Sequence, residues 1–248
     1  MSLRSFGSAA GLLAFLLIWE AISRSGLVAT TLLPAPSALP AALRSEIELG
    51  FWQAMVLASL NHYVIGLVIG SAGGIAVGVA VAMFPRFEIF QAWIARVLRP
   101  IPPLAWIPFA IIWFGLSEAA AAFIIAIGIF WVNYFATQAA VHAVDKDLIE
   151  LARAFGHRSL PALLRKVVLP AAAPGILGGL RTGLGMGWMT VVAAELFGIS
   201  GIGQRMMEAA GLLSTEIVIV YMLTIAMLYG LSDTAFVAMQ RRLLQWQR

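Results

Sequence analysis

The sequence predicts an all-α, polytopic membrane protein with about six transmembrane helices. Of its 248 residues, 61% are hydrophobic and only 11% are charged, whereas roughly a quarter charged is normal for a soluble domain. The mean hydropathy of +0.93 agrees with this. Apolar intervals long enough to cross the hydrocarbon core, which takes about 20 residues, recur along the chain. We expect a single transmembrane domain over residues 1–248.

The expected spans are about Ser8–Ile22, Ala54–Met83, Ile101–Leu116, Ala119–Val141, Ala171–Leu196 and Ile217–Met239. The first follows Arg4 and could be misread as a secretory signal, but no small-x-small cleavage site precedes the proline-rich stretch. We therefore expect this span to be retained. The stretch from Leu32 to Glu48 contains prolines and scattered charges, which predict a loop and a short interfacial helix outside the bilayer.

The distribution of Lys and Arg predicts the orientation, because cytoplasmic loops carry an excess of both. Twelve of the sixteen lie near the two termini and in the loops 85–99 and 142–166. Three lie on the opposite side, namely Arg24, Arg44 and Arg205, and one, Arg181, lies inside a span. We expect both termini, and the loop at about 142–166, to be cytoplasmic.

That loop contains a pattern typical of a short amphipathic helix. Its apolar positions follow the spacing of one helix face, and they are Leu148, Leu151, Ala152 and Phe155. Asp147 with Glu150 resembles a capping box and predicts the start of the helix there, while Gly156 predicts its end. The stripe is too small to build a core. It either lies on the lipid headgroups or fits a groove in a partner protein.

Two further patterns concern packing within the membrane. A glycine recurs every four residues in the second span, at Gly66, Gly70, Gly74 and Gly78. This predicts a smooth face that another helix approaches closely. The segment 99–108 is rich in proline, and Pro108 is expected to bend the helix that follows.

The sequence offers little chemistry. It has no phosphate-binding Gly-x-x-x-x-Gly-Lys-Ser/Thr motif, so the chain itself is not expected to hydrolyse ATP. His62, His142 and His157 are not at metal-ligand spacing, and there is no cysteine. We expect no catalytic residue, no metal and no cofactor in this chain. The pI of about 10.0 reflects a net charge of +4 spread around apolar spans, which does not favour nucleic acid as a partner.

The segment Glu150-Leu-Ala152, Gly156 and Val168-Leu169-Pro170 resembles the cytoplasmic EAA loop of the membrane subunits of ATP-binding-cassette (ABC) importers. That pattern has Glu-Ala-Ala, a Gly four residues after the second Ala, and Ile-x-Leu-Pro. Here Leu151 replaces the first Ala, and the interval from Gly156 to Pro170 is one residue longer. The extra residue predicts a different register for the following helix.

Five other segments, in order along nearly the whole chain, resemble one permease subfamily of these importers. They are LLPAPSA, LRPIPPLAWIPFAIIWFG, LPAAAPGILGGLRTGLGMGW, VVAAELFGISGIG and RRLLQW. The subfamily imports nitrate, alkanesulfonates and taurine, and has relatives for pyrimidine and riboflavin-like compounds. The resemblance implies type I importer architecture and a homodimer in the bacterial inner membrane. It also implies an external solute-binding protein, and two cytoplasmic ATPase subunits that hold ATP and Mg.

The resemblance also implies roles for residues. Docking to the ATPase would involve Asp147, Leu148, Glu150, Leu151, Ala152, Phe155 and Gly156. The Gly-rich segment from Gly198 to Thr215, with Gly201 and Gly203, resembles the outer element that receives the binding protein.

Four polar residues inside spans are candidates for the translocation pathway: His62, Asn133, Tyr134 and Arg181. A charge at the depth of Arg181 faces either the solute route or a structural partner. His62 stands where relatives usually carry Arg, and is either a titratable group of the route or a hydrogen-bonded interior histidine. Asn133 and Tyr134 either line the route or bond between helices. Glu195 is expected to be a solvated carboxylate near the outer end of its span.

We therefore predict the permease subunit of an importer for a small, anionic solute, working by alternating access. Two other classes remain open from the sequence. An ion-gradient transporter would use intramembrane acids such as Asp233 as proton carriers. A structural or receptor-like membrane protein would use the short helix to dock a regulator.

Overall fold

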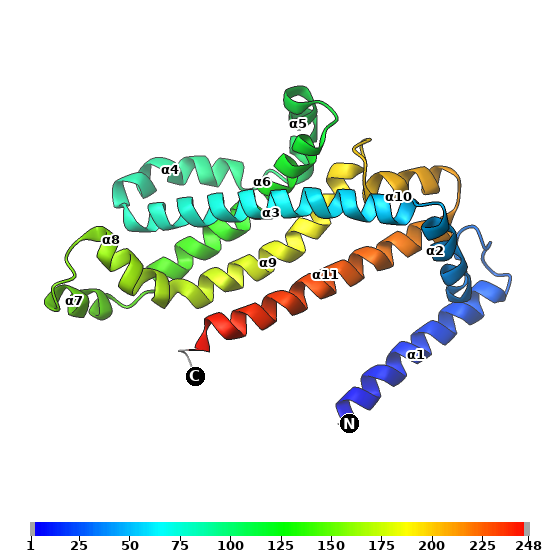
Figure 1. Ribbon diagram of the computed structural model, residues 1–248, viewed down its shortest axis with the longest axis horizontal. Helices are drawn as coiled ribbons and strands as arrows, with labels where there is room; N and C mark the ends of the chain where they lie inside the picture. The colour runs from blue at the N-terminus through cyan, green and yellow to red at the C-terminus, as the bar shows by residue number, and fades with distance from the viewer. Residues whose placement is uncertain (1–2, 246–248) are drawn as a thin grey trace. The chain divides into compact units, whose positions relative to one another are not determined.

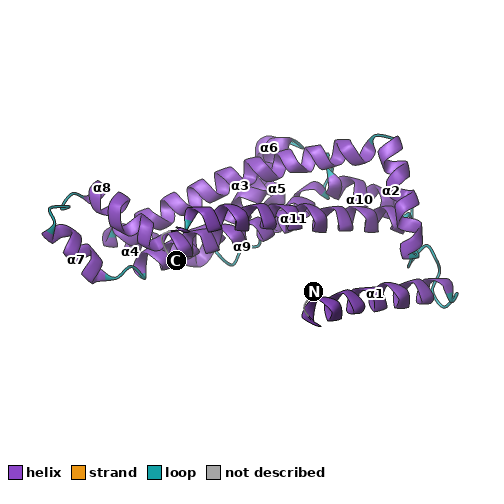
Figure 2. Cartoon of the chain, turned by 60° about the horizontal axis from the view of Figure 1, so that its bottom comes forward, coloured by secondary structure: helices purple, strands orange, loops and turns teal. Residues whose placement is uncertain are grey.

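The computed structural model describes residues 3–245, and every regular element in this range is helical (Figure 2). Contacts between Cα atoms divide the chain into two compact units. The first comprises residues up to 59 together with 200–227, and the second comprises 60–199 together with the residues from 228 onward. Two long helices, α3 (Phe51–Met83) and α11 (Thr215–Leu243), contribute to both units (Figure 1).

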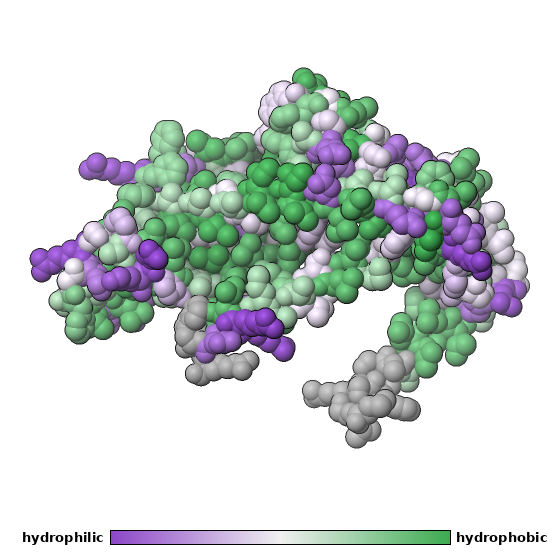
Figure 3. All heavy atoms as spheres, viewed as in Figure 1, coloured by the Kyte–Doolittle hydropathy of each residue, from purple (hydrophilic) through white to green (hydrophobic). Residues whose placement is uncertain are grey.

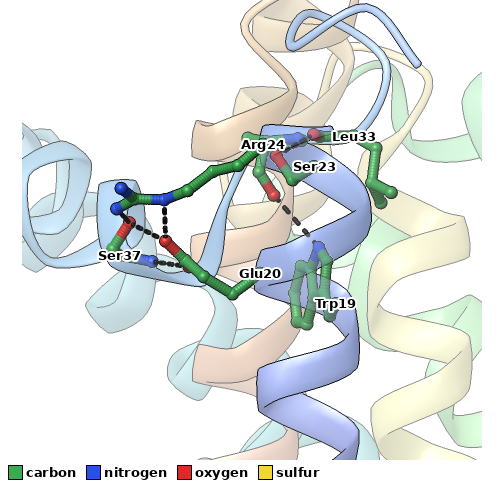
Figure 4. A network of polar contacts seen from close by, with 7 residues as sticks. Trp19, Glu20, Ser23, Arg24, Leu33 and Ser37 are labelled. Carbon is green, nitrogen blue, oxygen red and sulfur yellow. Dashed lines mark hydrogen bonds and ion pairs between the residues drawn. The ribbon is translucent and has the colours of Figure 1, made fainter. Parts of the chain in front are cut away.

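The first unit contains α1 (Leu3–Arg24), the 3-10 turn η1 (Pro36–Ala38), α2 (Leu39–Glu48) and α10 (Ile202–Gly211). Hydrogen bonds hold the proline-rich stretch against the end of α1 (Figure 4). The Trp19 indole donates to the carbonyl of Pro34 at 3.0 Å, and the Ser23 hydroxyl donates to that of Leu33 at 2.8 Å. Glu20 accepts from the backbone N–H and the hydroxyl of Ser37. The predicted loop and short helix are both present.

The second unit is arranged around α6 (Glu118–His142), and the glycine face of α3 packs against this helix. A Cβ atom at Gly70 would lie 2.5 Å from the carbonyl oxygen of Ala126, and one at Gly74 would lie 2.6 Å from that of Phe130. The backbones of the two helices are therefore in direct contact, as the four-residue spacing predicts.

A neighbouring face of α6, which shares Ile129 and Asn133 with the first, packs against α9 (Leu169–Glu195) through a second glycine face that was not predicted from the sequence. It consists of Gly175, Gly179, Gly183 and Gly187. A Cβ at Gly175 would lie 2.5 Å from the Cβ of Ala140. Because two glycine faces pack against it, the most apolar stretch of α6 is 56% buried, more than that of the other three long apolar helices.

The prolines of segment 99–108 make a sharp bend, but not where we expected it. The segment 85–99, expected to be a loop, is mostly the helix α4 (Pro85–Leu98). After the turn η2 (Pro103–Trp106), the chain continues as α5 (Ile107–Phe114), and the two helices differ in direction by 91°. Pro108 lies in the first turn of α5, where a missing backbone N–H costs no hydrogen bond, so it does not bend that helix.

Four helices among the described residues are long and apolar enough to cross a membrane, or five if the bent pair α4–α5 is counted as one broken span. They match the expected spans two to six. The first expected span lies within α1, which is not among these five. Hydrophobic side chains cover the middle of α3 and α9, whereas hydrophilic ones gather at α7 and α8 (Figure 3).

Candidate functional site

The predicted amphipathic helix is present as α7 (Lys146–Ala154), between α6 and α8 (Leu160–Leu163). Its N-cap is Asp145, whose carboxylate accepts from the backbone N–H of Asp147 at 2.9 Å, so the helix begins slightly earlier than the capping-box pattern suggested. Gly156 follows the end of α7 and has φ +90°, a left-handed conformation that closes the helix. His157 N–H donates to the carbonyl of Ala152 at 2.9 Å, and Gly156 N–H to that of Arg153 at 3.1 Å. This pair of bonds is a Schellman motif.

Three of the four residues of the predicted stripe point away from the core, whereas the fourth, Ala152, is buried at 8% exposure. Leu148, Leu151 and Phe155 are 46%, 55% and 76% exposed. On the other face, the partly buried Ile149 packs against a core cluster that includes Val168, the residue before α9. The helix is thus anchored on one face and presents large apolar side chains on the other.

The stripe lines one side of an open groove of about 620 Å³, whose other side is formed by residues that include Val167, Pro170 and Ala171. Such a groove suits an apolar or amphipathic segment of another protein. Glu150 is exposed on the same helix.

A π-helical turn, η3 (Leu164–Val168), connects α8 to α9. A π turn takes up one residue more than an α turn. It lies within the interval from Gly156 to Pro170 that is one residue longer than the family pattern. The extra residue is therefore accommodated locally, and α8, η3 and α9 form one helix of 36 residues.

His62 on α3 and Glu195 at the end of α9 form a buried pair. Nδ1 of His62 lies 2.9 Å from Oε1 of Glu195, and both side chains are at most 1% exposed. The expectation that Glu195 is a solvated carboxylate was wrong. Nε2 of His62 is buried without a hydrogen-bond partner among the described residues.

Arg181 on α9 has a partner on α11. Its Nε and Nη2 atoms donate to the two carboxylate oxygens of Asp233 at 2.7 and 2.8 Å. This bidentate pair favours the structural role for Arg181 over a direct role toward solute. It also makes Asp233 the acceptor of an ion pair rather than a free acid.

Asn133 and Tyr134 lie on the buried part of α6, each 1% exposed. Asn133 donates to the hydroxyl of Ser71 at 3.0 Å, which is a bond between helices. The hydroxyl of Tyr134 is buried and has no hydrogen-bond partner among the described residues.

The outer Gly-rich segment is more ordered than expected. Gly198 has φ +93°, a left-handed conformation that favours glycine. Gly201 precedes α10 and Gly203 is buried within it, so most of the expected loop is helix. The Ile202 N–H donates to the hydroxyl of Ser59 at 2.9 Å, which ties α10 to α3.

Residues 3–245 contain no cluster of three His, Asp or Glu side chains placed to hold a metal ion.

Residues 72–248 match the family described as "Binding-protein-dependent transport system inner membrane component". The chain is 34% identical over 244 residues to the taurine transport system permease protein TauC of Escherichia coli, covering 95% of this chain and 88% of that protein. It is 32% identical over 231 residues to the putative aliphatic sulfonates transport permease protein SsuC of Bacillus subtilis, and the match covers 93% of this chain and 83% of that protein. The bicarbonate transport system permease protein CmpB of Synechococcus elongatus is 36% identical to this chain over 209 residues, and the match covers 78% of this chain and 73% of that protein.

The fold is similar to a chain of the MetNI methionine ABC transporter in an inward-facing conformation. The TM-score is 0.66 at 21% identity, over 75% of this chain and 93% of that chain. At this identity the likeness concerns the fold alone, and the fold is that of a type I ABC importer permease.

Proposed function

Since this chain belongs to the family of binding-protein-dependent transport system inner membrane components, we propose that it is the permease subunit of an ATP-driven importer for a small anionic solute. The relatives named for aliphatic sulfonates, taurine and bicarbonate support this class of solute. The chain supplies the membrane path and no bond chemistry.

The observation that carries the proposal is the geometry of α7. A helix whose Ile149 packs against the core cluster and whose large apolar side chains are exposed can transmit force from a partner. The partner is an ATPase subunit with a groove for this stripe, and it holds the ATP and Mg. Closure of two such ATPases moves α7 and, through the short α8–η3 connection, the long helix α9.

The remaining parts of the proposal concern the assembly. Two copies of the chain form the path in the bacterial inner membrane, with both termini in the cytoplasm, and a solute-binding protein outside delivers the solute. The segment after Gly198 is largely the helix α10, and a helix offers that protein a rigid surface to bind.

Changes in α7 test the coupling. In a complete transporter reconstituted in vesicles, Glu150→Lys places the wrong charge on the docking helix, and Gly156→Pro removes the conformation with φ +90°. Both variants are expected to insert in the membrane, yet to lose nearly all ATP-dependent uptake. Uptake and ATP hydrolysis are measured on the same preparation.

Glu48→Lys is the matched control, because Glu48 is an exposed glutamate at the end of α2, with its side chain 63% exposed. It should transport like the wild type. Uptake at the wild-type rate in Glu150→Lys or Gly156→Pro would refute the coupling role of α7.

A further inference from the structure

A pocket of about 550 Å³ lies between α4 and the second half of α6, apart from the groove at α7. This volume is typical of a small-molecule site. Six of the ten residues that line it have polar side chains, namely Glu88, Gln91, Arg96, Arg99, Tyr134 and Gln138. All of them belong to the second unit.

Two positive charges lie at one end of the pocket. Arg96 and Arg99 are three residues apart, which places them on the same side of the helix. Neither guanidinium has an ion pair or a hydrogen bond among residues 3–245. Instead, Arg96 stacks on Trp93 at 4.8 Å and Arg99 on Phe135 at 4.4 Å. Stacking leaves the N–H groups at the edge of each guanidinium able to bind an oxyanion.

The carboxylate of Glu88, at the other end of the pocket, already has partners within the chain. Glu88 accepts from the side-chain amide of Gln138 at 3.1 Å, and Nε2 of His142 lies 3.8 Å away. Glu88 and Arg96 are eight residues apart, about 12 Å along the helix axis. A short anion at the arginine end therefore does not meet the carboxylate.

The hydroxyl of Tyr134 supplies an independent indication of a ligand. Tyr134 lines the pocket and is 1% exposed, and its hydroxyl lies near Gln91 but makes no hydrogen bond of normal length and angle with any described residue. A buried hydroxyl without a partner costs free energy. A ligand oxygen in the pocket would satisfy it.

We propose that this pocket between α4 and α6 binds a small oxyanion, with a short aliphatic sulfonate as its ligand. The anionic group is held by Arg96 and Arg99, and one of its oxygens accepts from the Tyr134 hydroxyl. Choosing a sulfonate rests on the proposed function. The oxyanion chemistry rests on the pocket itself.

Binding to the purified full-length chain, without binding protein or ATPase, tests the site. The chain is placed in nanodiscs of phosphatidylcholine and titrated calorimetrically with methanesulfonate and with taurine. We expect one saturable site for each. Arg96→Gln and Arg99→Gln should each weaken binding about tenfold or more, since each removes a charged donor.

Two further variants separate binding from folding. Tyr134→Phe should weaken binding severalfold without lowering the unfolding temperature, because the hydroxyl has no partner in the absence of ligand. Arg86→Gln changes an exposed arginine of the same helix that does not line the pocket, and should bind like the wild type.

Anionic lipid is the other source of an oxyanion, so the titration is repeated in nanodiscs containing phosphatidylglycerol. Unchanged sulfonate binding supports the proposal. Loss of sulfonate binding, together with arginine-dependent retention of phosphatidylglycerol, would assign the pocket to a lipid headgroup and overturn it. Equal binding by the wild type and both arginine variants would also overturn it.

ATP-driven uptake by the complete transporter is measured in parallel. Uptake without sulfonate binding in the pocket refutes this inference alone. Failure of uptake in the wild type bears on the proposed function instead.

Discussion

Glu46 shows how single residues fix the first unit. Its side chain is 1% exposed and accepts from Arg205 through Nη2 at 2.6 Å and Nε at 3.0 Å. The hydroxyl of Tyr221 donates to the same carboxylate at 2.8 Å, and Arg205 also stacks on Phe51 at 4.4 Å. One carboxylate therefore joins α2, α10 and α11, and the guanidinium adds α3. Arg205 and Tyr221 are 159 and 175 positions from Glu46, so their pairing with it could not be predicted from the sequence.

This cluster makes stability depend on pH. The hydrogen bonds from Arg205 are the main cause that holds the pKa of Glu46 below its ordinary value of 4.5. The folded state therefore binds the proton less readily than the unfolded state. The stabilisation is complete above about pH 4.5 and is lost as the pH falls through the lower, folded pKa. We expect the unfolding temperature of the purified protein to drop in this range.

Glu46→Gln should flatten that pH dependence and lower stability at neutral pH, because it leaves the largely buried Arg205 with only the half-exposed Glu208, at 3.2 Å, as a charged partner. Breaking such a pair costs about 3–5 kcal/mol. Glu48→Gln, at a carboxylate 63% exposed, is the control and should leave the profile unchanged. An unaltered profile in Glu46→Gln would show that another group controls the acid transition.

At the scale of elements, the glycine faces determine how closely the helices approach. At Gly70, an added methyl group would meet the backbone of α6 at 2.5 Å, so Gly70→Ala must push the helices apart. We expect a loss of about 1–3 kcal/mol, typical of overpacking. At Gly73 on the same helix, the nearest atom would be a ring carbon of Phe130 at 3.5 Å, an ordinary contact.

Gly73→Ala should therefore be neutral or stabilising by up to about 1 kcal/mol, since alanine favours the helix. Reversible unfolding in mixed micelles compares the two variants. Equal stability of both would mean that α3 and α6 do not approach as closely as described.

The two glycine faces also show what the sequence can predict. The face on α3 stands out because its glycines recur every four residues. The segment of α9 also carries Gly178 and Gly185, which obscure the same period. Helix α4 was expected to be a loop because it contains Arg86, Glu88 and Arg96. In the fold, the side chains of Glu88 and Arg96 line a polar pocket beside α6, so a helix can carry these charges without burying them among apolar groups.

For the candidate site, the local part was predictable and the distant pairs were not. The stripe of α7 and its glycine end follow from spacing and from the left-handed preference of Gly156. The pairs His62–Glu195 and Arg181–Asp233 join residues that are 133 and 52 positions apart. Their formation depends on which helices pack together, and single-sequence patterns do not specify that.

At the scale of the whole molecule, the proposed mechanism requires one orientation in the membrane. In the proposed mechanism the ATPase subunits dock on α7 from the cytoplasm, which requires α7 to be cytoplasmic. The distribution of twelve basic residues against three, of which Lys146 and Arg153 lie in α7, predicts this orientation independently of the family resemblance.

The absence of cysteine from the chain allows a direct measurement. Arg158→Cys follows α7, Arg44→Cys lies on α2, and both positions are on the surface. In intact spheroplasts, a membrane-impermeant maleimide should label Arg44→Cys at once and Arg158→Cys only after lysis. Labelling of Arg158→Cys from outside would put α7 on the side that has no ATPase, and coupling through this helix would then be impossible.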